Sequence, residues 1–342
     1  MASEDAPRGQ VDIAMTILAK ARTTLAYQGR ATMAGVMLVV LVVLGSATVS
    51  GFWSLESLRA NLLIASFLGI ATIGQTLCAL VGGLDLSIAF VVGAANIALL
   101  RLMDGGIPVG VSIVIVLILA AAVGGLSGAI SSKLRGATLV VTLGVGTALL
   151  GLVQILVSSS GVSGGTVEGS VPGWMQGLTA LNGPIGIAPC VIVWAVLAAL
   201  TILFLRRTWI GRGLYAMGGN QIAAQRAMMP TRTLWILVFS LSAVMAAVAG
   251  MILLGFTGGG YSGVGDPYLF TTIAAVLIGG TSLVGGRGGY GLTVLGVLDL
   301  TVLQTILSGF SLSAAAQEAI LGLLILPLAT LYVRSPHPRM EI

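Results

Sequence analysis

Charged residues are scarce in this sequence. They make up 8% of its 342 residues, whereas hydrophobic residues make up 57%. Soluble globular domains carry charge on about a quarter of their residues. The composition therefore excludes an ordinary soluble domain and predicts an all-α polytopic membrane protein.

Residues typical of enzyme active sites are also missing. The single histidine, His337, lies in the C-terminal tail, and neither Lys20 nor Lys133 follows a glycine. The nucleotide-binding loop G-x-x-x-x-G-K-[ST] is therefore absent. We expect no catalytic residue, metal site or cofactor in this chain. If its activity needs ATP, the ATPase must be another polypeptide.

The sequence has only two cysteines, Cys78 and Cys190, and both lie in or beside apolar segments. In the topology predicted below they fall near opposite faces of the bilayer, too far apart to bond. We expect them to pack without a disulfide. Glycine, by contrast, is abundant, with 49 residues scattered through the apolar segments. Small residues allow membrane helices to approach closely, so this pattern indicates tight helix packing rather than low complexity.

A helix needs about 20 apolar residues to cross about 30 Å of hydrocarbon. On that scale the sequence predicts ten membrane spans, at residues 32–50, 61–81, 86–102, 109–131, 138–158, 185–205, 234–256, 270–285, 290–309 and 314–333.

Basic residues indicate how these spans are oriented. With both termini in the cytoplasm, only Arg59 and Arg101 of the 16 lysines and arginines lie outside, a strong positive-inside bias. The basic residues form no stripe with interleaved aromatics, so nucleic acid is not an expected partner. The predicted organisation is a cytoplasmic segment 1–31, a membrane domain 32–333 and a cytoplasmic tail 334–342. Residues 11–27 are expected to form either a helix on the membrane surface or a disordered tail.

The longest polar interruption is Arg206–Arg232, here called the central basic segment. Its arginines are Arg206, Arg207, Arg212, Arg226 and Arg232. Gly218, Gly219 and Asn220 are predicted to form a turn ahead of a short helix at 221–228. The segment is either a solvated loop that only fixes topology or a docking surface for a cytoplasmic partner.

Three stretches occur in order along the chain: GGLDLS at Gly82–Ser87, GRGLYAMGGN at Gly211–Asn220 followed by Ala223, Ala224 and Arg226, and IAAVLIGGTSLVGGRG at Ile273–Gly288. Their combination resembles the ribose-type permeases of bacterial sugar ABC importers, over roughly residues 60–333. The resemblance identifies the permease superfamily and does not identify one sugar.

The resemblance implies a permease subunit in the bacterial inner membrane that carries a monosaccharide or related polyol. It also implies partners: a cytoplasmic ABC ATPase that binds ATP and Mg²⁺, a periplasmic sugar-binding protein, and a second permease copy, identical or related. Closure of the ATPase would move residues 211–228, and the spans would convert this movement into alternating access.

The resemblance assigns roles to two groups of residues. The ATPase-coupling residues are Gly211, Arg212, Tyr215, Gly218, Gly219, Asn220, Ala224 and Arg226. The gate or structural motif consists of Gly82, Gly83, Asp85, Ser87, Gly279 and Gly280. The predicted external loop at 159–184, like the turn at Tyr261, Asp266 and Pro267, is either a flexible connection or part of the surface that receives the binding protein.

Asp85 follows a glycine pair where a helix is expected to break. A carboxylate there can cap the next helix by accepting backbone N–H bonds, and the resemblance supports a structural or gating role. Residues 79–87 (ALVGGLDLS) and 276–284 (VLIGGTSLV) both place Gly-Gly at the inner end of an apolar segment. This suggests a two-half pseudo-repeat, with chance as the competing explanation in so glycine-rich a chain.

Asp299 lies in the middle of a predicted span, where a carboxyl must be protonated, paired or facing water. Relatives usually have an apolar residue there, so it either lines the substrate path or makes a polar packing contact. The candidate path residues, all of which could instead join helices, are Gln75, Asn96, Thr142, Asp299, Gln304 and Thr305. Relatives often have acidic residues where Leu269 and Thr271 stand, which leaves the substrate open.

Other classes of function remain to be tested. An ion-coupled carrier would use Asp299 as its coupling site, but it would not need the stretch at 211–226. A branched-chain amino acid permease is the nearest competitor within the superfamily, and GRGLYAMGGN favours the sugar branch. An intramembrane enzyme is disfavoured because histidine and paired carboxylates are missing from the spans.

Overall fold

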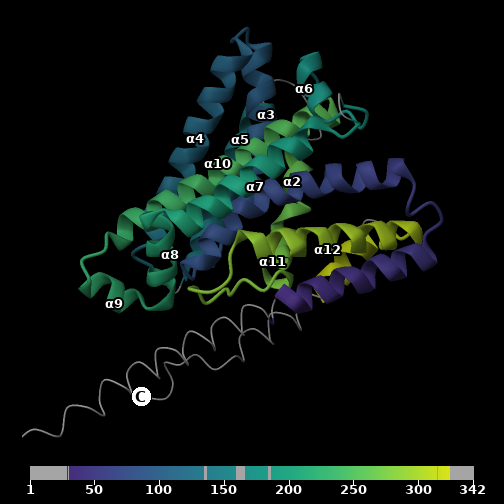
Figure 1. Ribbon diagram of the computed structural model, residues 1–342. Helices are drawn as coiled ribbons and strands as arrows, with labels where there is room; N and C mark the ends of the chain where they lie inside the picture. The colour runs from purple at the N-terminus through teal and green to yellow at the C-terminus, as the bar shows by residue number, and fades with distance from the viewer. Residues whose placement is uncertain are drawn as a thin grey trace, which may run out of the picture.

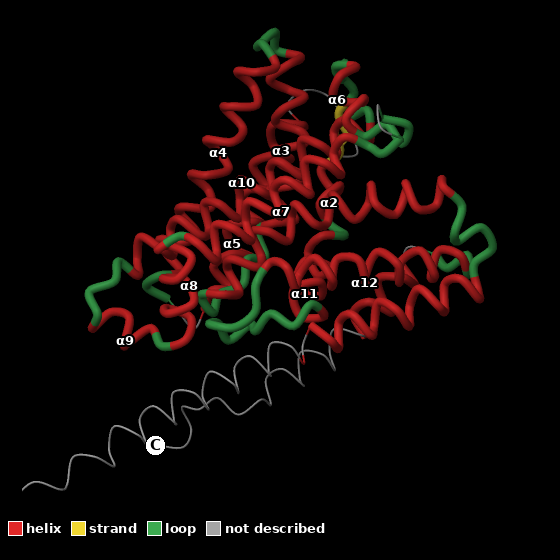
Figure 2. Tube along the Cα trace, in the orientation of Figure 1, coloured by secondary structure: helices red, strands yellow, loops and turns green. Residues whose placement is uncertain are grey.

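The computed structural model describes residues 29, 31–134, 137–158, 166–183, 186–313 and 315–323. The described chain is almost entirely helical (Figures 1 and 2). Its helices are Ala31–Thr48, α2 Leu55–Leu80, α3 Ile88–Asp104, α4 Val109–Ser131, α5 Thr138–Ser158, α6 Gly173–Leu178, α7 Pro189–Arg207, α8 Trp209–Gly219, α9 Gln221–Arg226, α10 Thr231–Thr257, the 3₁₀ helix η2 Ser262–Gly265, α11 Tyr268–Ile278, α12 Tyr290–Gly309, and a final helix at 315–323.

Seven helices of the described part are long and apolar enough to cross a membrane, as expected for a multi-pass membrane protein. At 17 and 11 residues, α3 and α11 are shorter. The tenth predicted span, 314–333, is described only in part, and residues 1–28 and 324–342 lie outside the described structure. The count of ten spans and the side of the membrane on which each terminus lies therefore stay predictions.

Several predicted span ends differ from those of the helices, and the differences are largest for two spans. The span predicted at 61–81 begins at Leu55, because Ser54 caps the helix by accepting a hydrogen bond from the Ser57 N–H at 3.2 Å. The span predicted at 270–285 ends at Ile278, because Gly280 takes a positive φ of 89°. Apolar content therefore continues past the residue at which the helix stops.

The long helix α10 forms the centre of the bundle and packs against α2, α3 and α4. Glycines make these contacts close. A Cβ at Gly128 of α4 would lie 2.7 Å from the Trp235 carbonyl oxygen of α10, and one at Gly74 of α2 would overlap Ser242. The predicted role of glycine in helix packing is confirmed at these positions.

Both glycine pairs singled out by the sequence end a helix in the same way. After α2, Gly82 N–H donates to the Ala79 carbonyl at 3.0 Å and Gly83 N–H to that of Cys78 at 2.9 Å. After α11, Gly280 and Thr281 make the equivalent bonds to Leu277 and Val276. This is the Schellman pattern, which favours glycine in the left-handed position.

The predicted register of the repeat is therefore wrong by one residue. Gly82, at φ 78°, corresponds to Gly280, at φ 89°, and not to Gly279. We call residues 81–87, between α2 and α3, the first break, and residues 279–289, between α11 and α12, the second break.

The two predicted external segments meet each other. Strand β1, Thr166–Val167, pairs antiparallel with β2, Gly260–Tyr261, so that Thr166 lies opposite Tyr261. Figure 1 places this region, with α6, at the end of the bundle opposite α8 and α9. Residues 159–165 and 184 of the predicted loop lie outside the described part.

Candidate functional site

The central basic segment folds into two short helices, α8 and α9. The Thr208 hydroxyl accepts from the Gly211 N–H at 3.0 Å and caps α8, while the Asn220 side chain accepts from the Ala223 N–H at 3.1 Å and caps α9. The prediction of a turn that includes Gly218 and Gly219 is wrong, because both residues belong to α8 and only Asn220 separates the helices. The predicted short helix is confirmed but ends at Arg226.

The predicted ATPase-coupling residues divide into two faces. Gly211, Gly218 and Ala224 are buried against the rest of the chain, whereas Arg212, Asn220 and Arg226 are exposed. A Cβ at Gly211 would overlap the Leu205 carbonyl oxygen at the end of α7. The inward residues can therefore hold the helices in place, and only the outward residues can touch a partner.

Gly218 brings the two breaks together. A Cβ at Gly218 would overlap both the Leu80 carbonyl oxygen at the end of α2 and the Gly286 nitrogen in the second break. These two groups bond to each other, with Gly286 N–H donating to Leu80 at 2.9 Å. A Cβ at Gly285 would likewise lie close to both Gly218 and the Gly82 nitrogen, so Gly218 of the predicted coupling set lies near Gly82 of the predicted gate motif.

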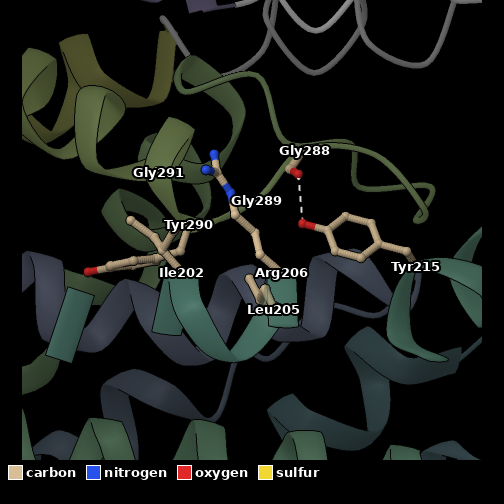
Figure 3. A pocket seen from close by; sticks show the side chains of 8 residues that line it. All are labelled: Ile202, Leu205, Arg206, Tyr215, Gly288, Gly289, Tyr290 and Gly291. Carbon is tan, nitrogen blue, oxygen red and sulfur yellow. Dashed lines mark hydrogen bonds between the residues drawn. The ribbon is translucent and has the colours of Figure 1, made fainter. Parts of the chain in front are cut away.

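Tyr215 lies one turn earlier on α8 and bonds to the same break. Its hydroxyl donates to the Gly288 carbonyl at 3.0 Å (Figure 3). A small cavity of about 110 Å³ lies beside this bond, between α7, α8 and the start of α12. Arg206 of α7 extends toward the same loop in Figure 3.

The outward surface of α8 and α9 is basic and partly apolar. All five arginines of the central basic segment are exposed, with Arg212 and Arg226 on α8 and α9 and the other three at the adjoining ends of α7 and α10, and the segment contains no acidic residue. The side chains of Ile222 and Met228 are 62% and 91% exposed. Sequence reasoning missed these two, although their place among polar residues of a basic segment was a usable signal. Such a surface is suited to a partner with an apolar groove and an acidic rim.

Asp85 is buried at the first break and makes three hydrogen bonds. Its carboxylate accepts from the Ser87 N–H at 2.9 Å, from the Ser87 hydroxyl at 2.5 Å and from the Ser242 hydroxyl of α10 at 2.7 Å. The predicted N–H bond at the helix start is present, but the N-cap position itself belongs to Ser87. Asp85 therefore joins the first break to the central helix.

Three of the candidate path residues make packing contacts. The Gln75 side-chain oxygen accepts from the Asp85 N–H at 3.3 Å, and the Thr142 hydroxyl accepts from the Leu86 N–H at 3.1 Å. Asn96 donates to the Gly250 carbonyl and accepts from the Tyr261 N–H. All three are buried, and they lie on different helices.

The other three lie on α12. Asp299 has 0% exposure, and within the described structure neither carboxyl oxygen has a hydrogen-bond partner. It shares a face of α12 with Gly296, which packs against Ala275 of α11. Thr305 donates to the Asn61 side chain of α2, and Gln304 is half-buried. The described structure does not gather the six candidate path residues around one cavity.

At the opposite end of the bundle, Tyr261 and Asp266 are exposed beside β2 and η2. Partial burial, and then the nearby Glu318, raise the pKa of the Asp266 carboxyl. Cys78 and Cys190 are both free, and the described residues contain no cluster of His, Cys, Asp or Glu suited to a metal ion.

Comparison with known proteins places the chain among transport proteins. The family model described as branched-chain amino acid transport system / permease component matches residues 57–329. The probable ABC transporter permease protein YphD of Escherichia coli (strain K12) is 32% identical over 290 residues, which cover 85% of each chain.

Two further relatives are named for sugars. The ribose import permease protein RbsC of Escherichia coli (strain K12) is 28% identical over 85% of this chain and 90% of its own. The fructose import permease protein FruG of Bifidobacterium longum is 26% identical over 85% and 86%. No solved structure matches the chain. The relatives are transport subunits rather than enzymes, and the chain belongs to the family of branched-chain amino acid transport system / permease components.

Proposed function

We propose that this chain is the membrane-spanning permease subunit of a binding-protein-dependent ABC importer for a monosaccharide or related polyol. The observation that carries the proposal is the outward face of α8 and α9, an exposed basic and partly apolar surface on a helix pair whose inner residues Tyr215 and Gly218 contact the second break and the end of α2. Relatives named for ribose and fructose import support the sugar branch over amino acids.

Each end of the helix bundle has a surface that we assign to one of the proposed partners. A cytoplasmic ATPase subunit, which binds ATP and Mg²⁺, docks on α8 and α9 through Ile222, Met228 and the surrounding arginines. A periplasmic sugar-binding protein docks at the β1–β2 end, and a second permease copy completes the path in the bacterial inner membrane. The sugar meets neutral hydrogen-bonding groups, and Asp299 is the proposed specificity residue on α12.

The test is co-purification from mild detergent with the products of neighbouring genes, followed by an ATPase assay of the complex. We expect one partner to contain a nucleotide-binding loop and to hydrolyse ATP faster when a periplasmic protein and its sugar are added. A chain that purifies alone and transports its solute under an ion gradient would contradict the proposal. Asp299, which lacks a partner in the described structure, would then become the leading coupling site.

A further inference from the structure

The contacts of α8 with the second break differ in kind from its contacts with the first. At the second break the Tyr215 hydroxyl holds the Gly288 carbonyl at 3.0 Å, and the Gly218 backbone packs against Gly285 and Gly286. Near the first break, the Gly218 backbone approaches the Leu80 carbonyl oxygen at the end of α2, and Leu214 and Met217 of α8 belong to the same buried apolar cluster as Val81. A hydrogen bond constrains the distance and direction between its partners, whereas apolar packing is not directional.

The second break is rich in glycine, and hydrogen bonds between its own residues set its local shape. Gly280, Gly285, Gly286, Gly288 and Gly289 all have positive φ. Glycine has more backbone freedom than other residues and supplies no side chain for packing. Within the break, the Gly289 N–H donates to the Thr281 hydroxyl at 3.1 Å and the Ser282 N–H donates to the Arg287 carbonyl at 3.0 Å. The position of the break relative to the bundle depends in addition on its hydrogen bonds to Tyr215 of α8 and to Leu80 of α2.

The first break is instead held by the bundle. The buried Asp85 carboxylate accepts from Ser242 of α10, and the Leu86 N–H donates to Thr142 of α5. Hydrogen bonds to a charged group are among the stronger ones in proteins, and leaving their buried members unpaired is costly. Moving this break relative to α10 would require those bonds to be given up.

We propose that α8 acts on the membrane domain through the second break, with Tyr215 as the positioning residue, while the first break stays fixed to α10. The inference rests on the proposed function, in which an ATPase moves α8. A displacement of α8 draws the Gly288 carbonyl with it and stretches the bond between Gly286 and Leu80. Because α12 begins at Tyr290, the start of α12 is displaced relative to the end of α2.

The experiment is hydrogen–deuterium exchange on the complete complex of permease, ATPase and binding protein, with and without ATP and Mg²⁺. Peptides that cover residues 279–289 are expected to change their exchange rate with nucleotide, and peptides that cover 81–87 are expected to keep theirs. Equal changes in both breaks, or a change in 81–87 alone, would overturn the proposal.

Tyr215→Phe is the matched variant, because it removes only the hydroxyl. Loss of one such bond is expected to lower the sugar transported per ATP hydrolysed by about fivefold, with ATPase association unchanged. The nucleotide response of 279–289 is expected to disappear. A purely structural role would lower the amount of folded protein and leave the ratio of sugar to ATP as it is, and that result would count against the proposal.

Gly213→Ala is the control on the same helix. Its new Cβ meets the mobile end of Met229 at 3.0 Å and no atom of either break within 4 Å, so its ratio of sugar to ATP is expected to match that of the original chain. These experiments distinguish failure of the proposed function from failure of the role of Tyr215. If no ATPase assembles with the original chain, the proposed function fails. If the complex forms and transports but Tyr215→Phe keeps the full ratio, only the role of Tyr215 fails.

Discussion

The two breaks end their first helices with the same hydrogen-bond pattern and are then stabilised by different means. The first break has one glycine with positive φ, Gly82, and a buried carboxylate, Asp85, that bonds to α10. The second break has five such glycines and no acidic residue, and it is bound by Tyr215 of α8. The same helix ending is thus followed by a break anchored to α10 in one half of the chain and by a break in contact with α8 in the other.

The difference predicts which substitutions affect which break. Side chains hold the first break, so it should respond to changes at Asp85 and Ser242. The Tyr215 side chain and the Gly218 backbone of α8 contact the second break, so it should respond to added volume at Gly218 and to loss of the Tyr215 hydroxyl. Substitutions on the outer face of α8 and α9 should leave both breaks intact and affect only the association with a partner.

The largest effect is expected for Gly218→Val. The added atoms would overlap Leu80 and Gly286 and separate α8 from both breaks at once, so sugar uptake should fall to background. Uptake of labelled sugar in cells, normalised to the amount of permease in the membrane, measures this. Gly213→Ala serves again as the control. Normal uptake by the valine variant would show that the close contact at Gly218 is not needed.

Arg226→Glu should have the next largest effect. Arg226 is exposed on α9, and reversing its charge is expected to weaken association with an acidic partner surface by about tenfold. Arg226→Lys retains the charge and should associate almost normally. The amount of ATPase that co-purifies with each variant is the measurement. Full association of the glutamate variant, with insertion unchanged, would remove Arg226 from the docking surface.

Asp85→Leu and Asp85→Asn test whether the Asp85 side chain anchors the first break to α10. Leucine leaves the Ser87 N–H, the Ser87 hydroxyl and the Ser242 hydroxyl without their acceptor, at a cost of about 1–3 kcal/mol for each buried group left unpaired. Asparagine retains one acceptor oxygen and should lose less. Thermal unfolding of the purified permease in detergent should rank the original chain above Asn, and Asn above Leu. Equal stability of all three would mean that Asp85 does not anchor the break.

Much of the helical pattern could be predicted from the sequence, because long apolar runs between basic residues determine where spans lie. The predicted spans at 109–131, 138–158 and 290–309 coincide with α4, α5 and α12. The ends of α2 and α11 were wrong because a polar cap and a glycine with positive φ decide them, and apolar content reports neither.

The candidate site was harder to predict. The motif identified Gly218 and Tyr215, but the sequence does not reveal that Gly218 meets Leu80 and Gly286, far away along the chain. A glycine in a motif indicates that another segment of the chain packs closely against it, but it does not identify that segment. Ile222 and Met228 were missed because their importance lies in their exposure, which depends on how α8 and α9 pack.

The smallest effect is expected for Asp299→Asn. The change keeps the size of the side chain, so the amount of folded protein should vary little. If Asp299 contacts the sugar, the preference among related sugars should shift, as competition uptake assays can measure. Reduced expression with an unchanged preference would assign Asp299 to helix packing instead.

Reconstitution into liposomes tests most directly whether ATP hydrolysis by a partner drives transport through α8. The permease, its co-purified ATPase and the sugar-loaded binding protein are combined, and uptake is compared under ATP with Mg²⁺, under a proton or sodium gradient, and under neither. We expect uptake with ATP alone and loss of that uptake in Gly218→Val. Uptake driven by the ion gradient without ATP, retained in Gly218→Val and abolished in Asp299→Asn, would contradict this expectation.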